Sequence, residues 1–394
     1  MSPTTLSQAR AQTLAGMVGS AHVLVCTGSG GVGKTTTAAA LAVAAAEGGR
    51  RTIVLTIDPA RRLAQSLGLE SLDNRPRPVA GVDGLDAMML DMKRTFDEVI
   101  DRYAPSVGRS ERIKSNRFYQ QLAGSLAGTQ EYMAMEKLYD LHQTGTYDLI
   151  VIDTPPTRNA LDFLDAPRRL TDFLEGRFLR MFLAPGMAAG RLASRAVGMG
   201  TGMFMRAASR ITGASVLDDL AQFFQSMDGM YEGFKDRAQA VYKLLQSPRS
   251  GFVVVATAEP PALREARYFI QRLAQDGMPT AGLVVNRVTP PPPAGLAEVN
   301  PGAVQRATAA LAGGGPAQQA AAALLLLHLD RRDVSRREAR AVSAALHGVE
   351  VPALVEIPLL ASDVHDLDGL RAIALHLTGA HRAADDRLKA VTGP

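Results

Sequence analysis

The sequence predicts an α/β fold, with a mostly parallel, doubly wound sheet and a helical insertion. The first observation is that strand-like apolar runs alternate with helical patterns along the chain, which is typical of parallel βαβ units. The second is that most of these runs are near-continuous valine, isoleucine and leucine, as expected for strands covered on both faces. The third is the stretch 165–250, in which no strand pattern occurs.

Seven segments have the strand pattern. In chain order they are Val23–Thr27, Thr52–Ile57, Leu85–Leu90, Leu149–Ile152, Phe252–Thr257, Gly282–Val285 and Leu354–Ile357. Residues 165–250 are predicted to form the helical insertion, and residues 295–350 form an alanine- and leucine-rich helical segment that Gly313–Pro316 interrupts. At 394 residues the chain exceeds a typical single domain, so one large α/β domain with insertions, or two domains, is expected; we interpret residues 1–394 as one large domain carrying both helical segments.

The composition limits the classes of protein to consider. The single cysteine, Cys26, excludes disulfides within the chain and any zinc site built from cysteines alone, and its place in a predicted strand indicates a core thiol. A net charge of +4 over 394 residues predicts neither nucleic-acid nor membrane binding by itself. The first 20 residues lack an apolar leader pattern, and no charge-free apolar stretch reaches membrane-spanning length. We therefore expect a soluble, cytoplasmic protein.

The most informative motif is the segment Gly28–Thr35, which reads GSGGVGKT and satisfies G-x-x-x-x-G-K-T between a predicted strand and a predicted helix. Its glycines let backbone N–H groups converge on phosphate oxygens, and the helix N-terminus favours negative charge. Lys34 can then reach the β and γ phosphates, and the Thr35 hydroxyl can bind Mg²⁺. The alternative is a glycine-rich turn that merely opens a helix. The sheet is thus predicted to be of the P-loop NTPase type.

Two acidic residues end strands near this loop. Asp153 follows the strand Leu149–Ile152, where nucleotidases hold Mg²⁺ through a carboxylate, although an aspartate after a strand is common on its own. Asp58 follows the strand that begins at Thr52, where a carboxylate can orient a water molecule for attack on the γ phosphate. A helix cap at this strand-to-helix junction is the alternative, and the two interpretations are compatible.

Five motifs together resemble the arsenite-pump ATPase (ArsA) family, which includes the eukaryotic ATPases that target tail-anchored membrane proteins. The motifs are Gly28–Thr36, Thr56–Ala60, Asp153–Thr157, Val284–Arg287 and Ile357–Leu360. This family belongs to the deviant P-loop group that also holds MinD, ParA and the nitrogenase iron protein. The resemblance covers residues 22–94, 147–170, 251–288 and 351–371.

The resemblance implies a role for each matching residue. The phosphates of ATP are bound by the loop and the start of its helix, namely Ser29, Gly30, Gly31, Val32, Gly33, Lys34, Thr35 and Thr36. Thr35 binds Mg²⁺, and Asp153 acts on the same ion through water. Asp58 positions the attacking water. Asn286 reads the edge of the adenine, and Pro358 and Leu359 pack against the base.

The sequence also departs from the family pattern. Ser29 stands where the family has a signature lysine that reaches the partner's phosphates across the dimer, and Arg158–Asn159 replace a Gly-His pair. Losing such a lysine should leave binding intact and slow hydrolysis. The Cys-x-x-Cys of eukaryotic dimers is missing, as are the cysteines that bind arsenite and the second ATPase unit of the bacterial pumps. We therefore expect a homodimer, or a heterodimer with a lysine-bearing paralogue, and no arsenite transport.

The predicted insertion contains a second unusual region. Between Gly176 and Leu217 there is no acidic residue, and arginines alternate with methionines. The arginines and methionines are Arg177, Arg180, Arg191, Arg195, Arg206, Arg210, Met181, Met187, Met199, Met203 and Met205. In the targeting ATPases the corresponding region is a methionine-rich groove for a client helix, a use that suits a flexible side chain. Helices that merely cover the core, and a basic surface for anionic lipid or an acidic protein, are the alternatives.

We compare four functions with these observations. The first is an Mg²⁺-dependent ATPase whose dimer closure acts on a protein client or membrane partner through residues 176–217. The second is an ATP-binding regulatory subunit with low hydrolysis of its own. A ParA-like ATPase on DNA would need a basic strip, but the arginines of residues 331–340 alternate with acidic residues, so nucleic-acid binding is not expected. A small-molecule kinase fits the phosphate loop but not the motifs at Asp58 and Asp153.

Overall fold

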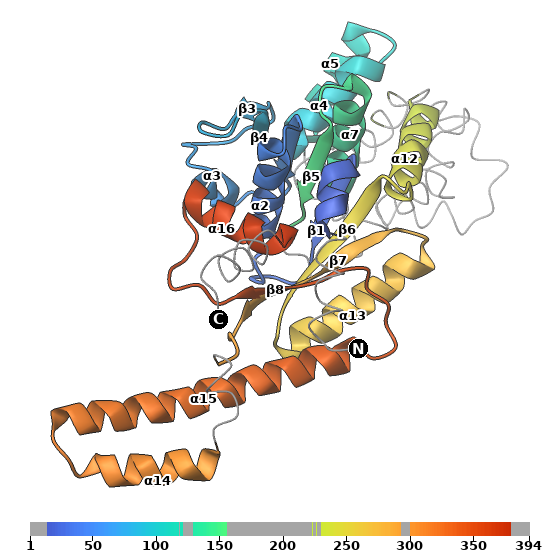
Figure 1. Cartoon of the computed structure of the whole chain (residues 1–394). Helices are drawn as coiled ribbons and strands as arrows, with labels where there is room; N and C mark the ends of the chain where they lie inside the picture. The colour runs from blue at the N-terminus through green and yellow to red at the C-terminus, as the bar shows by residue number, and fades with distance from the viewer. Residues whose placement is uncertain are drawn as a thin grey trace, which may run out of the picture.

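The computed structural model of the chain describes residues 14–117, 119–120, 129–155, 230–292 and 300–379, together with residues 223 and 226. Eight strands form one sheet in the order β3-β4-β2-β5-β1-β6-β7-β8. Their bounds are β1 Val23–Thr27, β2 Thr52–Thr56, β3 Arg77–Pro78, β4 Leu85–Met89, β5 Leu149–Asp153, β6 Ser250–Thr257, β7 Thr280–Val288 and β8 Leu354–Pro358. Neighbouring strands are parallel except for the β3–β4 pair, and helices cover both faces (Figure 1).

All seven predicted strands are confirmed, and β6 and β7 are longer than predicted because polar residues at their ends still join the ladder. The sequence analysis missed β3. This strand has only two residues, both exposed, and it pairs antiparallel at the edge of the sheet. A segment that short carries no hydrophobic periodicity, so no pattern could have indicated it.

Ten helices are described in full. They are α2 Lys34–Glu47, α3 Arg62–Ser66, α4 Met92–Tyr103, α5 Val107–Ser115, α7 Thr129–Thr144, α12 Tyr231–Leu245, α13 Pro260–Gln275, α14 Pro301–Ala312, α15 Pro316–Ala345 and α16 Leu367–Thr378. The alanine-rich α2 is almost wholly buried, because it packs between the central strands and α16. Small side chains allow this close approach and bring the loop before α2 tightly against the sheet. None of the described helices combines the length and apolar character of a membrane span.

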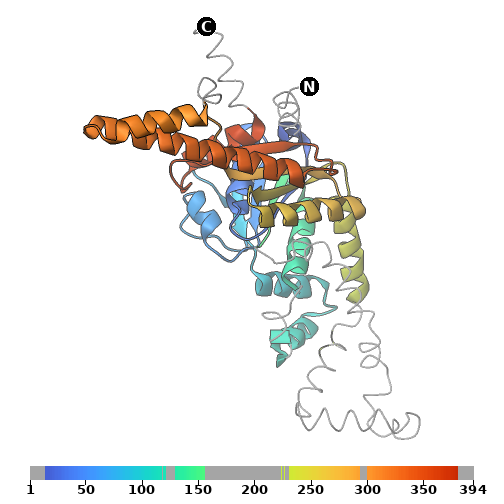
Figure 2. The same cartoon turned by 90° about the horizontal axis from the view of Figure 1, so that it is seen from below.

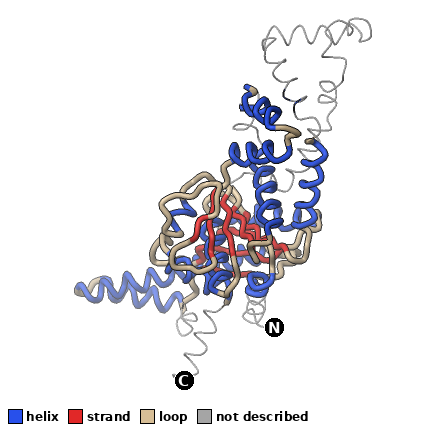
Figure 3. Tube along the Cα trace, turned by 90° about the horizontal axis from the view of Figure 1, so that it is seen from above, coloured by secondary structure: helices blue, strands red, loops and turns tan. Residues whose placement is uncertain are grey.

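The two predicted helical segments differ in how much of them is described. Of residues 165–250, α12 is helical as predicted, while the methionine- and arginine-rich stretch 176–217 lies outside the described residues. In the second segment, 295–350, the helices α14 and α15 are confirmed, and they are separated by Gly313–Gly315 as predicted. Figures 2 and 3 show this pair of helices projecting from the body that contains the sheet.

Candidate functional site

The loop between β1 and α2 can be built only with glycine at two of its positions. Gly28 has φ of +151°, and a Cβ atom there would lie 2.0 Å from the carbonyl oxygen of Val255 in β6. Gly33 has φ of +100°, and a Cβ atom there would lie 2.2 Å from Nδ2 of Asn286 in β7. A left-handed backbone and the lack of space both exclude larger residues. The loop is therefore fixed against the carboxyl ends of β6 and β7.

Lys34 is the first residue of α2, and its side chain folds back over the loop. Its Nζ donates to the backbone oxygen of Ser29 at 2.9 Å, and the side chain is buried. Burial lowers the pKa of Lys34, although the carboxylates of Asp153 and Asp58 act in the opposite direction. An ammonium group that is hydrogen-bonded to a backbone carbonyl of the loop can exchange this bond for hydrogen bonds to phosphate oxygens.

Asp153 is the best-defined acidic group of the site. Its Oδ2 accepts hydrogen bonds from Oγ1 of Thr35 at 2.8 Å and from Oγ1 of Thr56 at 2.9 Å, and the residue is fully buried. Its Oδ1 is buried with no hydrogen-bond partner among the described residues. Burial raises the pKa of Asp153 to about 6, and the bonds to the two threonines only partly offset this. A buried carboxylate whose desolvation is only partly offset by hydrogen bonds, next to a threonine hydroxyl, fits a hard cation such as Mg²⁺.

Thr56 connects this carboxylate to Asp58, a link that the sequence analysis did not find. The N–H of Asp58 donates to Oγ1 of Thr56 at 3.2 Å, and Oδ1 of Asp58 accepts from the N–H of Ala60 at 3.0 Å. The Asp58 side chain thus closes a turn and does not cap α3, because the N-cap residue of α3 is Arg61. Nε2 of Gln130 in α7 donates to the backbone oxygen of Ile57 at 2.8 Å. The turn at Asp58 is therefore held from two sides.

Asn286 lies at the same edge of the sheet, opposite Thr257 in β6. Its Nδ2 donates to the backbone oxygen of Val32 at 2.9 Å, and its Oδ1 accepts from the N–H of Arg287 at 3.0 Å. The described contacts of Asn286 are thus with the loop, and its role in reading adenine stays a prediction.

Pro358 ends β8 beside Val288 of β7, and the N–H of Leu359 donates to the oxygen of Val288 at 2.8 Å. Leu359 is 54% exposed. Its contact with the base stays a prediction.

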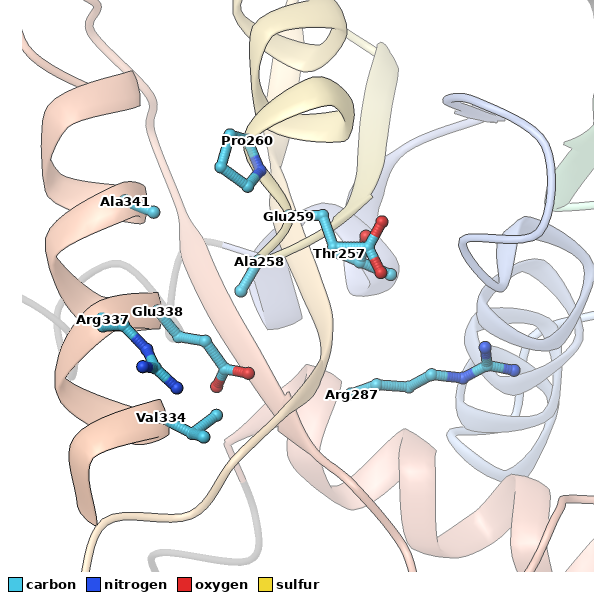
Figure 4. A pocket seen from close by; sticks show the side chains of 9 residues that line it. All are labelled: Thr257, Ala258, Glu259, Pro260, Arg287, Val334, Arg337, Glu338 and Ala341. Carbon is cyan, nitrogen blue, oxygen red and sulfur yellow. The ribbon is translucent and has the colours of Figure 1, made fainter. Parts of the chain in front are cut away.

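A cavity of about 380 Å³ lies beside Asn286, between the ends of β6 and β7 and the helices α13 and α15 (Figure 4). Its charged lining residues are Glu259, Arg287, Arg337 and Glu338. The sequence analysis had Arg287 in a family motif and the last two in a segment of mixed charge, but it assigned none of the four to a site. Arg287 is the one non-glycine residue in the described ranges with a left-handed backbone, at φ of +60°. The rule that ligands bind at the carboxyl ends of parallel strands is the signal that could have found these residues.

The site as described is therefore made of the ends of β1, β2 and β5 and the first turn of α2. It brings together Lys34, Thr35, Asp58 and Asp153, as the sequence predicts, and adds Thr56. Residues 156–160, which contain the replaced Gly-His pair, lie outside the described residues. No group of three or more histidine, cysteine or acidic residues that could hold a metal occurs within the described ranges. Any ion bound here must complete its ligands with water and the nucleotide.

Comparisons with known proteins agree with this geometry. A family profile described as "Anion-transporting ATPase" matches residues 21–298. The ATPase GET3 of Malassezia globosa is 28% identical over 292 residues, which are 74% of this chain and 80% of that protein. The ATPase ARSA2 of Chlamydomonas reinhardtii is 32% identical over 266 residues, 66% of each chain. The arsenical pump-driving ATPase of Acidiphilium multivorum is 28% identical over 272 residues, 68% of this chain but only 39% of that protein.

Proposed function

The chain belongs to the anion-transporting ATPase family and is thus an ATP hydrolase of the P-loop class; from this premise we propose that it hydrolyses ATP with Mg²⁺ and couples closure of a dimer to a protein client or membrane partner. The observation that carries the proposal is the pair of hydroxyl groups, from Thr35 and Thr56, on the buried carboxylate of Asp153. They join the phosphate loop to the turn that holds Asp58.

The residues of the chain divide the work. The loop amides and Lys34 bind the β and γ phosphates, which requires Lys34 to exchange the Ser29 oxygen for phosphate oxygens. Thr35 and Asp153 would hold Mg²⁺, the threonine directly and the carboxylate through water. When bound, the ion neutralises charge on the β and γ phosphates. Asp58 accepts a hydrogen bond from the attacking water and orients it toward the γ phosphate.

A chain of contacts supports coupling from this site to the segment that follows β5. Gln130 binds the backbone of Ile57 next to Asp58, and it lies at the beginning of α7. Further along α7, Glu136 forms a buried ion pair with Arg237 of α12, in which Nε and Oε2 are 2.8 Å apart. Because α12 belongs to the predicted insertion, residues 165–250, a displacement of the turn at Asp58 would be passed through α7 to that insertion.

The second candidate function is an ATP-binding subunit of a heterodimer, with low hydrolysis of its own. The observation that favours it is Ser29, which lacks the side-chain charge that the family places at this position. In such a heterodimer, a lysine of the paralogue would complete the site of this chain.

Sedimentation velocity of the Asp58→Asn variant tests the dimer closure. This variant should bind Mg²⁺-ATP and retain it, because the substitution removes only the group that orients water. We expect Mg²⁺-ATP, but not ADP, to shift the variant to a dimer that is more compact than any dimer formed without nucleotide. Sedimentation identical with ATP, with ADP and without nucleotide would contradict closure by a homodimer. A shift that occurs only after a lysine-bearing paralogue is added would favour the heterodimer.

A further inference from the structure

The helices α14 and α15 form an antiparallel hairpin whose base is fixed to the body. Near the base, the carboxylate of Glu338 accepts hydrogen bonds from N and Oγ1 of Thr289, at 2.7 and 3.2 Å. Arg267 of α13 donates to the backbone oxygen of Ala345 at 3.2 Å. The part beyond this base, residues 301–329, is here called the arm, and it projects away from the sheet (Figures 1 and 2). The family profile ends at residue 298, before the arm begins.

The arm is almost free of charge and poorly buried. Residues 307–329 contain no aspartate, glutamate, lysine or arginine. Within residues 301–329 only Val304 and Ala322 are buried, and the buried atoms Thr308 Oγ1 and His328 Nε2 lack hydrogen-bond partners in the described part of the chain. An isolated pair of short helices with so small a core is marginally stable in water. The arm would therefore gain stability from a surface that covers it.

Six exposed apolar residues of the arm lie on one broad face. In α14 the inner positions are Val304, Thr308 and Leu311, so helical periodicity places an alanine stripe on one flank. In α15 the inner positions are Ala322, Leu325 and Leu329, so the same periodicity places Leu324, which is 66% exposed, on the flank on the same side of the hairpin, and Leu327, which is 52% exposed, at the outer edge of that face. We call this surface the arm face; its residues are Ala303, Ala307, Ala310, Ala320, Leu324 and Leu327, all exposed. Leu326 is exposed on the opposite flank and serves as an internal reference.

We propose that the arm face binds the arm face of a second copy of this chain, forming a four-helix bundle that holds two copies together without nucleotide. The stripe on α14 is made of alanine only, whereas the stripe on α15 carries the leucines. A two-fold axis along the arms lays α15 of each copy on α14 of the other, so that Leu324 of each copy packs against the alanine stripe of the other, with Leu327 at the edge of the contact. The face is thus complementary to itself, and the contact goes beyond the ATP-driven closure proposed above.

A lipid surface fits the arm less well. Residues 300–345 contain no phenylalanine, tyrosine or tryptophan, which interfacial helices use as anchors. The opposite flank carries Gln305 and Gln319 beside Leu326, so polar side chains interrupt that flank, whereas the arm face has none. The charges that follow it at 330–340 are of both signs, because Asp330, Asp333 and Glu338 interrupt the arginines, so the segment is not the continuous basic cluster that anionic lipid attracts.

The size of the face sets the strength of the contact. Two helices of about 12 residues, each about 18 Å long and about 10 Å apart, present a face of roughly 400 Å² per copy. That is about half of the roughly 800 Å² that each partner contributes to a stable interface. We therefore expect a dimer that dissociates at low protein concentration, with a Kd on the order of 1–100 μM.

Sedimentation velocity without nucleotide tests the contact with a matched pair of variants. We expect the wild-type chain and Leu326→Glu to dimerise with similar Kd values, and the double variant Leu324→Glu/Leu327→Glu to have a Kd at least about 30-fold higher. All three positions are exposed, so circular dichroism should show unchanged folding. Equal dimerisation of the three proteins would overturn the proposal. A monomer at 200 μM would also overturn it, and flotation with anionic vesicles that both Leu324 and Leu326 support would then assign the arm to lipid.

Cross-linking adds a geometric test that does not depend on affinity. The native cysteine, Cys26, is buried, so a single introduced cysteine is the accessible thiol of each variant. Ala303 and Leu324 lie nearly the same number of residues from the turn at Gly313–Gly315. Mixing Ala303→Cys with Leu324→Cys under mild oxidation should give a covalent heterodimer, and Leu326→Cys in place of Leu324→Cys should not. Equal yields from both mixtures would contradict the proposed arrangement, whereas neither result bears on ATP-driven closure.

Discussion

The helix of the nucleotide site and the helices of the arm differ in burial: α2 packs against the sheet, whereas the arm is mostly exposed. At the site, the loop before α2 packs against β6 and β7. Lys34 donates to the backbone oxygen of Ser29, and Asn286 of β7 donates to the backbone oxygen of Val32. Most residues of the arm are exposed, and in the described part of the chain hydrogen bonds from Thr289 to Glu338 and from Arg267 to Ala345 hold the hairpin at its base. The site therefore depends on the identity of single residues, while the arm depends on the character of a face. This difference predicts which substitutions each region tolerates.

Removing Lys34 should have the largest effect. Lys34→Ala takes the charged donor out of the loop, and we expect steady-state ATP hydrolysis to fall by about 10²–10³-fold. The arm variant Leu324→Glu/Leu327→Glu should change turnover per chain less than about twofold at saturating ATP, because it leaves every group of the site in place. Phosphate release measured for both variants checks this. A comparable loss in the arm variant would show that the two regions are not separate.

A pair of glycine substitutions compares the packing of the two regions. Gly28→Ala places a Cβ atom 2.0 Å from the Val255 oxygen, at a φ of +151°. We expect it to lower the free energy of unfolding by about 3 kcal/mol or more. At the tip of the arm, Gly313 has no atom within 4 Å of such a Cβ. Gly313→Ala should therefore change the free energy by no more than about 0.5 kcal/mol. Urea denaturation of both variants measures the difference, and similar values would contradict the account of the loop.

The ionised side chain of Asp153 should lower the free energy of unfolding of the nucleotide-free protein. Its pKa is raised to about 6 in the folded chain, from an unperturbed value near 3.8. Between these values the folded state binds more protons, so the stability that the group contributes is present below about pH 4 and lost as the pH rises through 6. Asp153→Asn should consequently stabilise the nucleotide-free protein by up to about 3 kcal/mol at pH 8 and by much less at pH 4.5. Denaturation at the two pH values tests this, and a variant less stable than wild type at pH 8 would contradict it.

The clamp at the base of the arm should have the smallest effect. Glu338→Gln weakens two hydrogen bonds to Thr289 but keeps one acceptor, and we expect a loss of about 1 kcal/mol. Hydrogen exchange should rise in α14 and α15 and stay unchanged in β1 and α2. Gln318→Glu, a substitution near the exposed tip, is the control. Faster exchange in the phosphate loop would show that the arm supports the site directly.

The sequence predicts what depends on local pattern. Continuous apolar runs indicate the strands, and GSGGVGKT indicates the loop with Lys34 and Thr35, because both are set by residues next to one another. Position after a strand indicates Asp58 and Asp153. Thr56 and Gln130 could not be assigned in this way, since their partners are 97 and 73 positions away in the chain and only the sheet order brings them together. The arm face likewise needs the handedness of the hairpin, which spacing alone does not give.

Steady-state ATP hydrolysis by the chain purified alone, with Asp58→Asn as the blank, tests the central claim most directly. The account predicts Mg²⁺-dependent turnover above the blank, because Lys34, Thr35, Asp58 and Asp153 are assembled within one chain. Turnover equal to the blank, with ATP still tightly bound, would contradict a site that is complete without a partner's lysine.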